Sequence, residues 1–172
     1  YYKNIVKCIT LHEKDPDDIL TYLRLSICHL AIGDYLRAFK YLGIIEKKDD
    51  LPIEYYFAIG ICNVHFNRFK NAIDFFNISE VSDDYIIKFD SIYLKAFSLS
   101  KIGKYDESVI HFQLLLDSSY SHPQITKEDI EFQIACLLNQ TQNNKLKLSF
   151  TSYFSNSLTQ ANSIYLDLEQ KN

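Results

Sequence analysis

One pattern of residues recurs along the chain at an interval close to 34 residues. The stretch YLRLSICHLAIGDYLRAFKYL begins at Tyr22, and a matching stretch, YFAIGICNVHFNRFKNAIDFF, begins at Tyr56. A third copy places Ala96 at the position of Gly60, after 36 residues, and a weaker fourth copy places Ala135 there, after 39 more. Such a period predicts a row of similar units, because one unit alone cannot bury its apolar side and stacking supplies the core.

Each copy holds two positions for small residues, which we expect where the two antiparallel helices of a unit cross closely. The first set is Ser26, Gly60, Ala96 and Ala135, and the second set is Ala38, Ala72 and Ser108. Gly33 and Gly103 suit a left-handed turn between the two helices of a unit. We expect the large apolar residues between these positions to fill the space between helices.

This spacing of large, small and aromatic residues resembles the tetratricopeptide repeat (TPR). The resemblance implies an all-α fold, a TPR-type α-solenoid in which antiparallel helix pairs form a right-handed superhelix. We expect a single array over residues 1–172, with repeats at 19–48, 53–81, 89–118 and 127–156. Residues 1–15 would be the second helix of a preceding repeat, and residues 158–170 a capping helix or the next first helix. Because the chain contains no Met and starts in mid-repeat, we expect a fragment of a longer protein.

The balance of charges bears on the class of partner. The formal net charge is −4 and the pI is about 5.7, whereas a phosphate-binding surface normally needs clustered Lys and Arg. No apolar run approaches the roughly 18 residues of a membrane span, and no signal-peptide pattern opens the chain. We therefore expect a protein partner, with no direct contact to nucleic acid and no membrane.

No set of residues in the sequence forms a convincing catalytic or metal site. Cys28 and Cys62 have His neighbours, but equivalent positions of stacked repeats lie roughly 8–10 Å apart, whereas each sulfur must lie about 2.3 Å from a shared zinc. The acidic clusters DPDD, KKDD and SDD precede predicted helices, where acids complement the helix N-terminus. Nucleotide-binding motifs are also missing from the sequence. We expect no enzyme activity, no catalytic residue, no metal and no cofactor.

The first helix of each repeat should line the inner, concave face of the array. Two positions per helix, four residues apart, should point inward because residues i and i+4 share a face. They are Leu23, Ile27, Phe57, Ile61, Tyr93, Phe97, Phe132 and Cys136, a set that we call the inner row. All eight are apolar or aromatic, which predicts a partner-binding groove; packing between helices is the alternative.

Three acids precede the inner row, and they suggest a negative edge beside the groove. Glu54, Asp90 and Asp129 occupy equivalent places in three successive helices, where they could meet basic residues of a partner. Helix N-terminal electrostatics explains them equally well. A clamp for a C-terminal carboxylate, as in chaperone-binding repeats, disagrees with the apolar row, and Arg24 is the only Arg of the predicted first helices.

The longest interval falls at the Ser-rich spacer around Pro123, between YDESVIHFQLLL and EDIEFQIACLL. These two segments and their long link resemble the repeat region of the UTX histone demethylases and the related fungal general corepressor, over roughly residues 55–145. The chain departs from that pattern at Lys147, where a small residue is usual. A local change of stacking angle is one interpretation of the long spacer, and a neutral loop insertion is the other.

The resemblance implies a nuclear scaffold that joins a β-propeller corepressor or a chromatin complex to other regulators. We therefore expect a non-catalytic protein-interaction scaffold of transcriptional corepressor complexes, with nuclear localisation and cytoplasmic localisation as the alternative. Two other functions stay open. One is a TPR module of a cell-cycle ligase, transport or co-chaperone complex, and the other is a non-catalytic arm of a chromatin-modifying enzyme.

Overall fold

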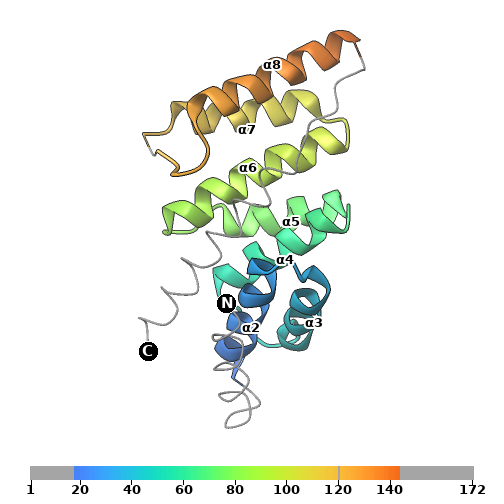
Figure 1. The fold of residues 1–172 in the computed structure, drawn as a ribbon, viewed down its shortest axis with the longest axis vertical. Coiled ribbons are helices and arrows are strands. Elements are labelled where there is room, and N and C mark those ends of the chain that lie inside the picture. Colours follow the sequence, from blue (N-terminus) through green and yellow to red (C-terminus); the bar gives the residue numbers. More distant parts are fainter. Residues whose placement is uncertain (1–17, 120, 144–172) are drawn as a thin grey trace.

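The computed structural model describes residues 18–119 and 121–143, and it contains seven helices and no strand within these ranges (Figure 1). The helices are α2 (Ile19–Ala31), α3 (Tyr35–Ile45), α4 (Ile53–His65), α5 (Phe69–Ser79), α6 (Tyr85–Lys101), α7 (Tyr105–Asp117) and α8 (Lys127–Asn143). Each helix packs against the next one along the chain, and α4 also contacts both α2 and α6. The helices therefore form three stacked pairs, α2–α3, α4–α5 and α6–α7, followed by α8.

The two helices of a pair are buried to different extents. Every residue from Thr21 to Ala31 of α2 is buried, and so are most residues of α4 and α6. In α3, by contrast, only Ala38, Leu42 and Ile45 are buried, and α5 and α7 each bury three residues at the equivalent positions. The first helices are thus the interior of the array, and the second helices each bury one narrow stripe.

The small residues lie where the helices cross, as their positions predicted. A Cβ atom added to Gly60 in α4 would lie 2.6 Å from the ring of Phe76 in α5, closer than van der Waals contact allows. In the third pair, the Ser108 hydroxyl donates a hydrogen bond to the carbonyl oxygen of Ala96 at 2.6 Å, and both residues are fully buried. Small side chains are therefore required for these helices to approach one another.

The turns within the pairs have the predicted left-handed backbone. Gly33 has φ +77° and Gly103 has φ +82°, and Asn67, at the equivalent position of the second pair, has φ +57°. Glycine adopts this region without strain, and Asn is the residue that tolerates it next best. The turn geometry is therefore shared by all three pairs.

The third pair begins earlier than residue 89, where we expected it. The Asp84 side chain accepts hydrogen bonds from the backbone N–H groups of Ile86 and Ile87, at 2.8 and 3.1 Å, and so starts α6 at Tyr85. This cap extends α6 by about one turn at its N-terminus. The predicted helices at 1–15 and 158–170, and the second helix of the fourth repeat after Asn143, lie outside the described residues.

Candidate functional site

The structure buries most of the inner row. Seven of its eight side chains are at most 7% exposed, whereas Phe132 in α8 is 64% exposed. The seven are Leu23, Ile27, Phe57, Ile61, Tyr93, Phe97 and Cys136. The row is therefore not an open apolar surface over its described length, and a role in partner binding stays a prediction for it.

Ring contacts explain where these side chains point. The Phe57 ring lies 6.4 Å from that of Phe76, and the Tyr93 ring lies 5.3 Å from that of Phe112, so each contacts the second helix of its own pair. Phe97 instead contacts Phe69 of the preceding pair, with 6.1 Å between the ring centroids. Such contacts favour packing between helices, the alternative that the sequence left open for this row.

The three predicted acids lie in three different environments. Glu54 is half-buried at the start of α4, Asp90 is fully buried in α6, and Asp129 is exposed at the start of α8. The Asp129 carboxylate accepts hydrogen bonds from the backbone N–H and the hydroxyl of Thr126, at 2.9 and 3.0 Å. Together they do not form the continuous acidic edge that the sequence suggested, and Asp129 has the helix-capping role instead.

The spacer around Pro123 is attached to α6 by a buried histidine that the sequence analysis did not single out. His122 Nε2 lies 3.3 Å from a carboxylate oxygen of Asp90, and the side chains are 1% and 0% exposed. The imidazole also stacks on Phe89, with 4.8 Å between the ring centroids. A local sequence pattern could not reveal this contact, because its partners belong to different repeats.

Hydrogen bonds at the other ring nitrogen define the tautomer of His122. Its Nδ1 accepts from the backbone N–H groups of Gln124 and Ile125, at 3.1 and 3.0 Å, so the proton belongs on Nε2, facing Asp90. An adjoining cavity of about 280 Å³ is lined by Phe89, Leu115 and Ile125 among others. Because both members of the His122–Asp90 pair are buried, the arrangement holds the spacer on α6.

Burial affects the ionisation of Cys62 and Tyr93. Cys28, Cys62 and Cys136 are buried, and burial raises the pKa of the Cys62 thiol to about 12. Burial, together with the charges of Asp129 and Asp90, raises the pKa of Tyr93.

Within residues 18–119 and 121–143 no group of three His, Cys, Asp or Glu side chains could hold a metal ion. In the same ranges no helix is both long and apolar enough to cross a bilayer.

The comparisons with known proteins bear on the fold. No protein-family model matches the sequence, and no curated protein matches it either. A crystal structure of MamA, a helical-repeat protein of the tetratricopeptide type, is similar with a TM-score of 0.67 and 16% sequence identity. The alignment covers 97% of this chain and 87% of that one. The fold is a TPR-type α-solenoid. At this identity the likeness concerns the fold alone.

Proposed function

We propose that this TPR-type array is a non-catalytic scaffold for protein–protein interaction. The observation that carries the proposal is the stack of three equivalent helix pairs, since arrays of this kind provide extended binding surfaces. The polar groups singled out in the sequence have structural roles that agree with it. Asp84 and Asp129 cap helices, and Asp90 holds the spacer through His122.

The partners that we propose are a β-propeller corepressor or a subunit of a chromatin complex, in the nucleus. Support comes from the resemblance of YDESVIHFQLLL, the long spacer and EDIEFQIACLL to the UTX and corepressor repeats. His122 of this spacer contacts Asp90 of α6, which agrees with a spacer that has a structural role. Within the inner row, Phe132 is the member that we propose for direct contact, because it is exposed.

An affinity purification from nuclear extract tests this function. The immobilised chain should recover chromatin regulators, identified by mass spectrometry, and a Phe132→Ala variant should recover less of them. The overpacked variant Ala72→Leu serves as the control for a damaged array, because Ala72 is fully buried. Exclusive recovery of cytosolic chaperones would contradict the nuclear assignment and favour the co-chaperone alternative.

A further inference from the structure

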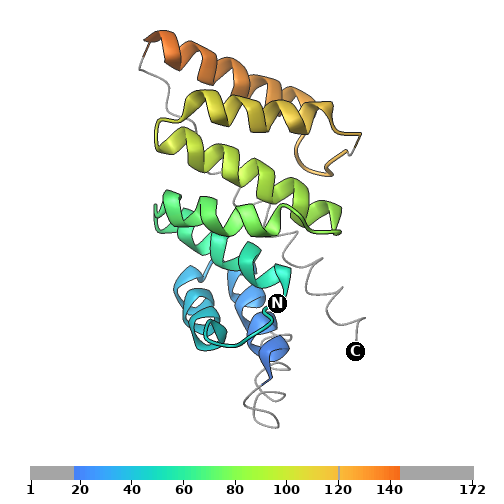
Figure 2. The same ribbon diagram turned by 180° about the vertical axis from the view of Figure 1, so that it is seen from behind.

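Figure 2 shows α5, α6 and α7 as successive helices of the array. A groove between α5 and α7, with α6 as its floor, is lined by residues of these helices and of the turn that joins α6 to α7. We call it the α5–α7 groove; its volume is about 580 Å³. Ile73, Leu99 and Ile102 supply its apolar lining. Its polar lining is formed by Lys70, Asp74, Asn77, Lys95, Lys104, Glu107 and His111. Residues of α5 line one side of it, and residues of α7 line the other.

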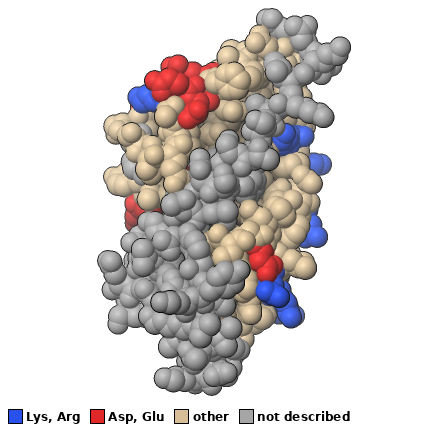
Figure 3. Space-filling view, in the orientation of Figure 1, with Lys and Arg blue, Asp and Glu red and all other residues tan. Residues whose placement is uncertain are grey.

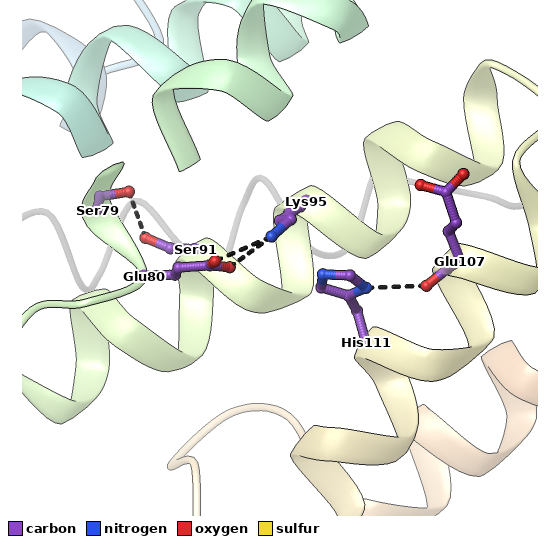
Figure 4. A network of polar contacts seen from close by, with 6 residues as sticks. All are labelled: Ser79, Glu80, Ser91, Lys95, Glu107 and His111. Atoms are coloured by element: carbon purple, nitrogen blue, oxygen red, sulfur yellow. Dashed lines mark hydrogen bonds and ion pairs between the residues drawn. The ribbon is translucent and has the colours of Figure 1, made fainter. Parts of the chain in front are cut away.

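Hydrogen bonds between α5 and α6 hold the floor of the groove in place (Figure 4). The Lys95 ammonium donates to both carboxylate oxygens of Glu80, at 2.8 and 2.9 Å, and the Lys95 side chain is only 11% exposed. The hydroxyls of Ser79 and Ser91 are 2.7 Å apart and buried. A floor fixed in this way is ready for binding without reorganisation, which lowers the cost of association.

Polar contacts also define the wall made by α7. Lys104 lies 2.8 Å from a carboxylate oxygen of Glu107. Figure 4 shows the contact between His111 Nδ1 and the Glu107 carbonyl oxygen, at 2.9 Å. Helical spacing extends the α7 wall by one turn to Leu114, three residues after His111. By the same rule the α5 wall extends to Ile78, four residues after Asp74.

The residues at these two positions, Ile78 and Leu114, are exposed aliphatic side chains, and they occupy equivalent positions in their repeats. Ile78 is 43% exposed and Leu114 is 55% exposed, and Ile44 occupies the equivalent place in the first pair, at 45%. Neither the core nor the helix crossings require an aliphatic side chain there. Recurrence at one outward position, beside a groove, points to an apolar contact with something outside the array.

The two ends of the groove differ in charge. Lys70 and Lys104 lie at the end where the helices α5 and α7 begin, and neither helix has a side-chain cap on its N-terminal N–H groups. The dipole of α5, which has no acid in its first turn, adds positive potential beside Lys70, whereas α7 has Asp106 and Glu107 in its first turn. Several Lys and Arg side chains lie along the right edge of the molecule in Figure 3, with an acidic patch among them, and Asp and Glu gather mainly at the upper left. A matching partner must be acidic at one end and aliphatic at the other.

We propose that the α5–α7 groove binds an amphipathic helix of a partner protein. The aliphatic side chains of that helix contact Ile78 and Leu114, and its acidic side chains face Lys70. A helix is the shape that fits, because the lining follows α5 from Lys70 to Asn77 and the α7 side from Lys104 to His111, about 12 Å of helix. The inference rests on the proposed scaffold function and names the surface and the partner chemistry.

The test uses helical peptides selected from a random phage-displayed library against the full chain. Enriched peptides are expected to carry aliphatic residues at i, i+3 or i+4, and i+7 together with Asp or Glu. Fluorescence polarisation of a labelled enriched peptide should then show about tenfold weaker binding to Leu114→Gln and to Lys70→Glu. Both residues are exposed, so these variants should fold normally, with circular dichroism as the check.

Two substitutions of matched chemistry outside the groove are the controls. Leu36→Gln removes an aliphatic side chain that is 73% exposed on α3, and Lys40→Glu reverses an exposed charge on the same helix. Both should bind the peptide within about twofold of the wild type. No enrichment, enrichment of basic peptides, or equal binding by Leu114→Gln and Leu36→Gln would overturn the groove.

The scaffold function is judged separately, by the nuclear-extract purification. If the wild type and Leu114→Gln recover the same partners in equal amount, the scaffold stands and the groove is wrong as their docking site. If the wild type recovers none while the selected peptides bind as expected, the groove stands and the scaffold assignment is wrong.

Discussion

At the scale of single residues, two helical glycines differ in what surrounds them. Gly60 in α4 faces the buried ring of Phe76, whereas Gly43 in α3 has nothing within 4 Å of an added Cβ atom. Both lie inside helices, where glycine costs roughly 0.5–1 kcal/mol relative to alanine. Only Gly60 therefore has a packing reason for being glycine.

Alanine substitutions at these two glycines should change stability in opposite directions. Gly60→Ala should lower the free energy of unfolding by about 1–3 kcal/mol, because the Phe76 ring is fully buried and cannot move aside. Gly43→Ala should raise it by about 0.5–1 kcal/mol through the gain in helix propensity. Urea denaturation monitored by circular dichroism measures both, and destabilisation by Gly43→Ala would count against this account.

The buried His29 makes stability depend on pH. Burial lowers the pKa of His29 below its usual value of 6.5, with Asp34 at 3.6 Å acting in the opposite direction. The unfolded chain therefore takes up a proton more readily than the folded one. This histidine should cost no stability above pH 6.5, and it should lower the free energy of unfolding as the pH falls from 6.5 through the folded pKa.

Denaturation midpoints at pH 8, 6.5 and 5 compare the wild type with His29→Gln. We expect the variant to lose less stability than the wild type between pH 6.5 and 5, because it lacks the group whose protonation opposes folding. His111→Gln, on the surface of α7, is the control for a general effect of removing a histidine. Parallel pH profiles for the wild type and His29→Gln would contradict the assignment to His29.

At the scale of elements, the long spacer between α7 and α8 is held by specific contacts. His122 accepts two backbone hydrogen bonds within the spacer and places its Nε2 beside Asp90 of α6. Ile125, a buried spacer residue, and Phe89, which stacks on His122, line the cavity beside it. The position of α8 on the array therefore depends on the spacer as well as on its contacts with α7.

Removal of the imidazole should loosen the spacer and α8 more than the rest of the array. His122→Ala leaves one buried and one partly buried N–H group without their acceptor and removes the neighbour of Asp90, at a cost of about 1–3 kcal/mol. Hydrogen exchange measured by mass spectrometry should show faster exchange in residues 121–143 and little change in α4 and α5. Ser121→Ala, at an exposed position of the same spacer, is the matched control. Uniformly faster exchange throughout the chain would contradict a local role.

At the scale of the whole molecule, the features that depend on one repeat were predictable from sequence, and those that depend on several were not. The helix pairs, the small residues at the crossings and the left-handed turns at Gly33 and Gly103 are all set by local patterns. Burial of the inner row depends on how the second helices and the neighbouring pairs pack around it. The His122–Asp90 contact joins different repeats, and the α5–α7 groove exists only where two pairs meet.

Phe57 and Phe132 occupy equivalent positions of the inner row but differ in burial, so substituting each one tests how stacking changes the role of this position. Phe57 in α4 is 5% exposed and contacts Phe76, whereas Phe132 in α8 is 64% exposed. Phe57→Ala should leave a cavity inside the array and lower the free energy of unfolding by about 3–5 kcal/mol. Phe132→Ala should change it by less than about 0.5 kcal/mol, as expected for a surface substitution.

Partner recovery from nuclear extract distinguishes partner contact, which we expect of Phe132, from core packing, which we expect of Phe57. Phe132→Ala should reduce recovery while keeping the wild-type melting temperature, because its side chain is available for contact and contributes little to the core. Phe57→Ala should lower the melting temperature, and any loss of binding should follow from that loss of fold. If Phe57→Ala melts at the wild-type temperature but no longer recovers partners, this account is wrong. The buried residues of the inner row would then bind the partner directly.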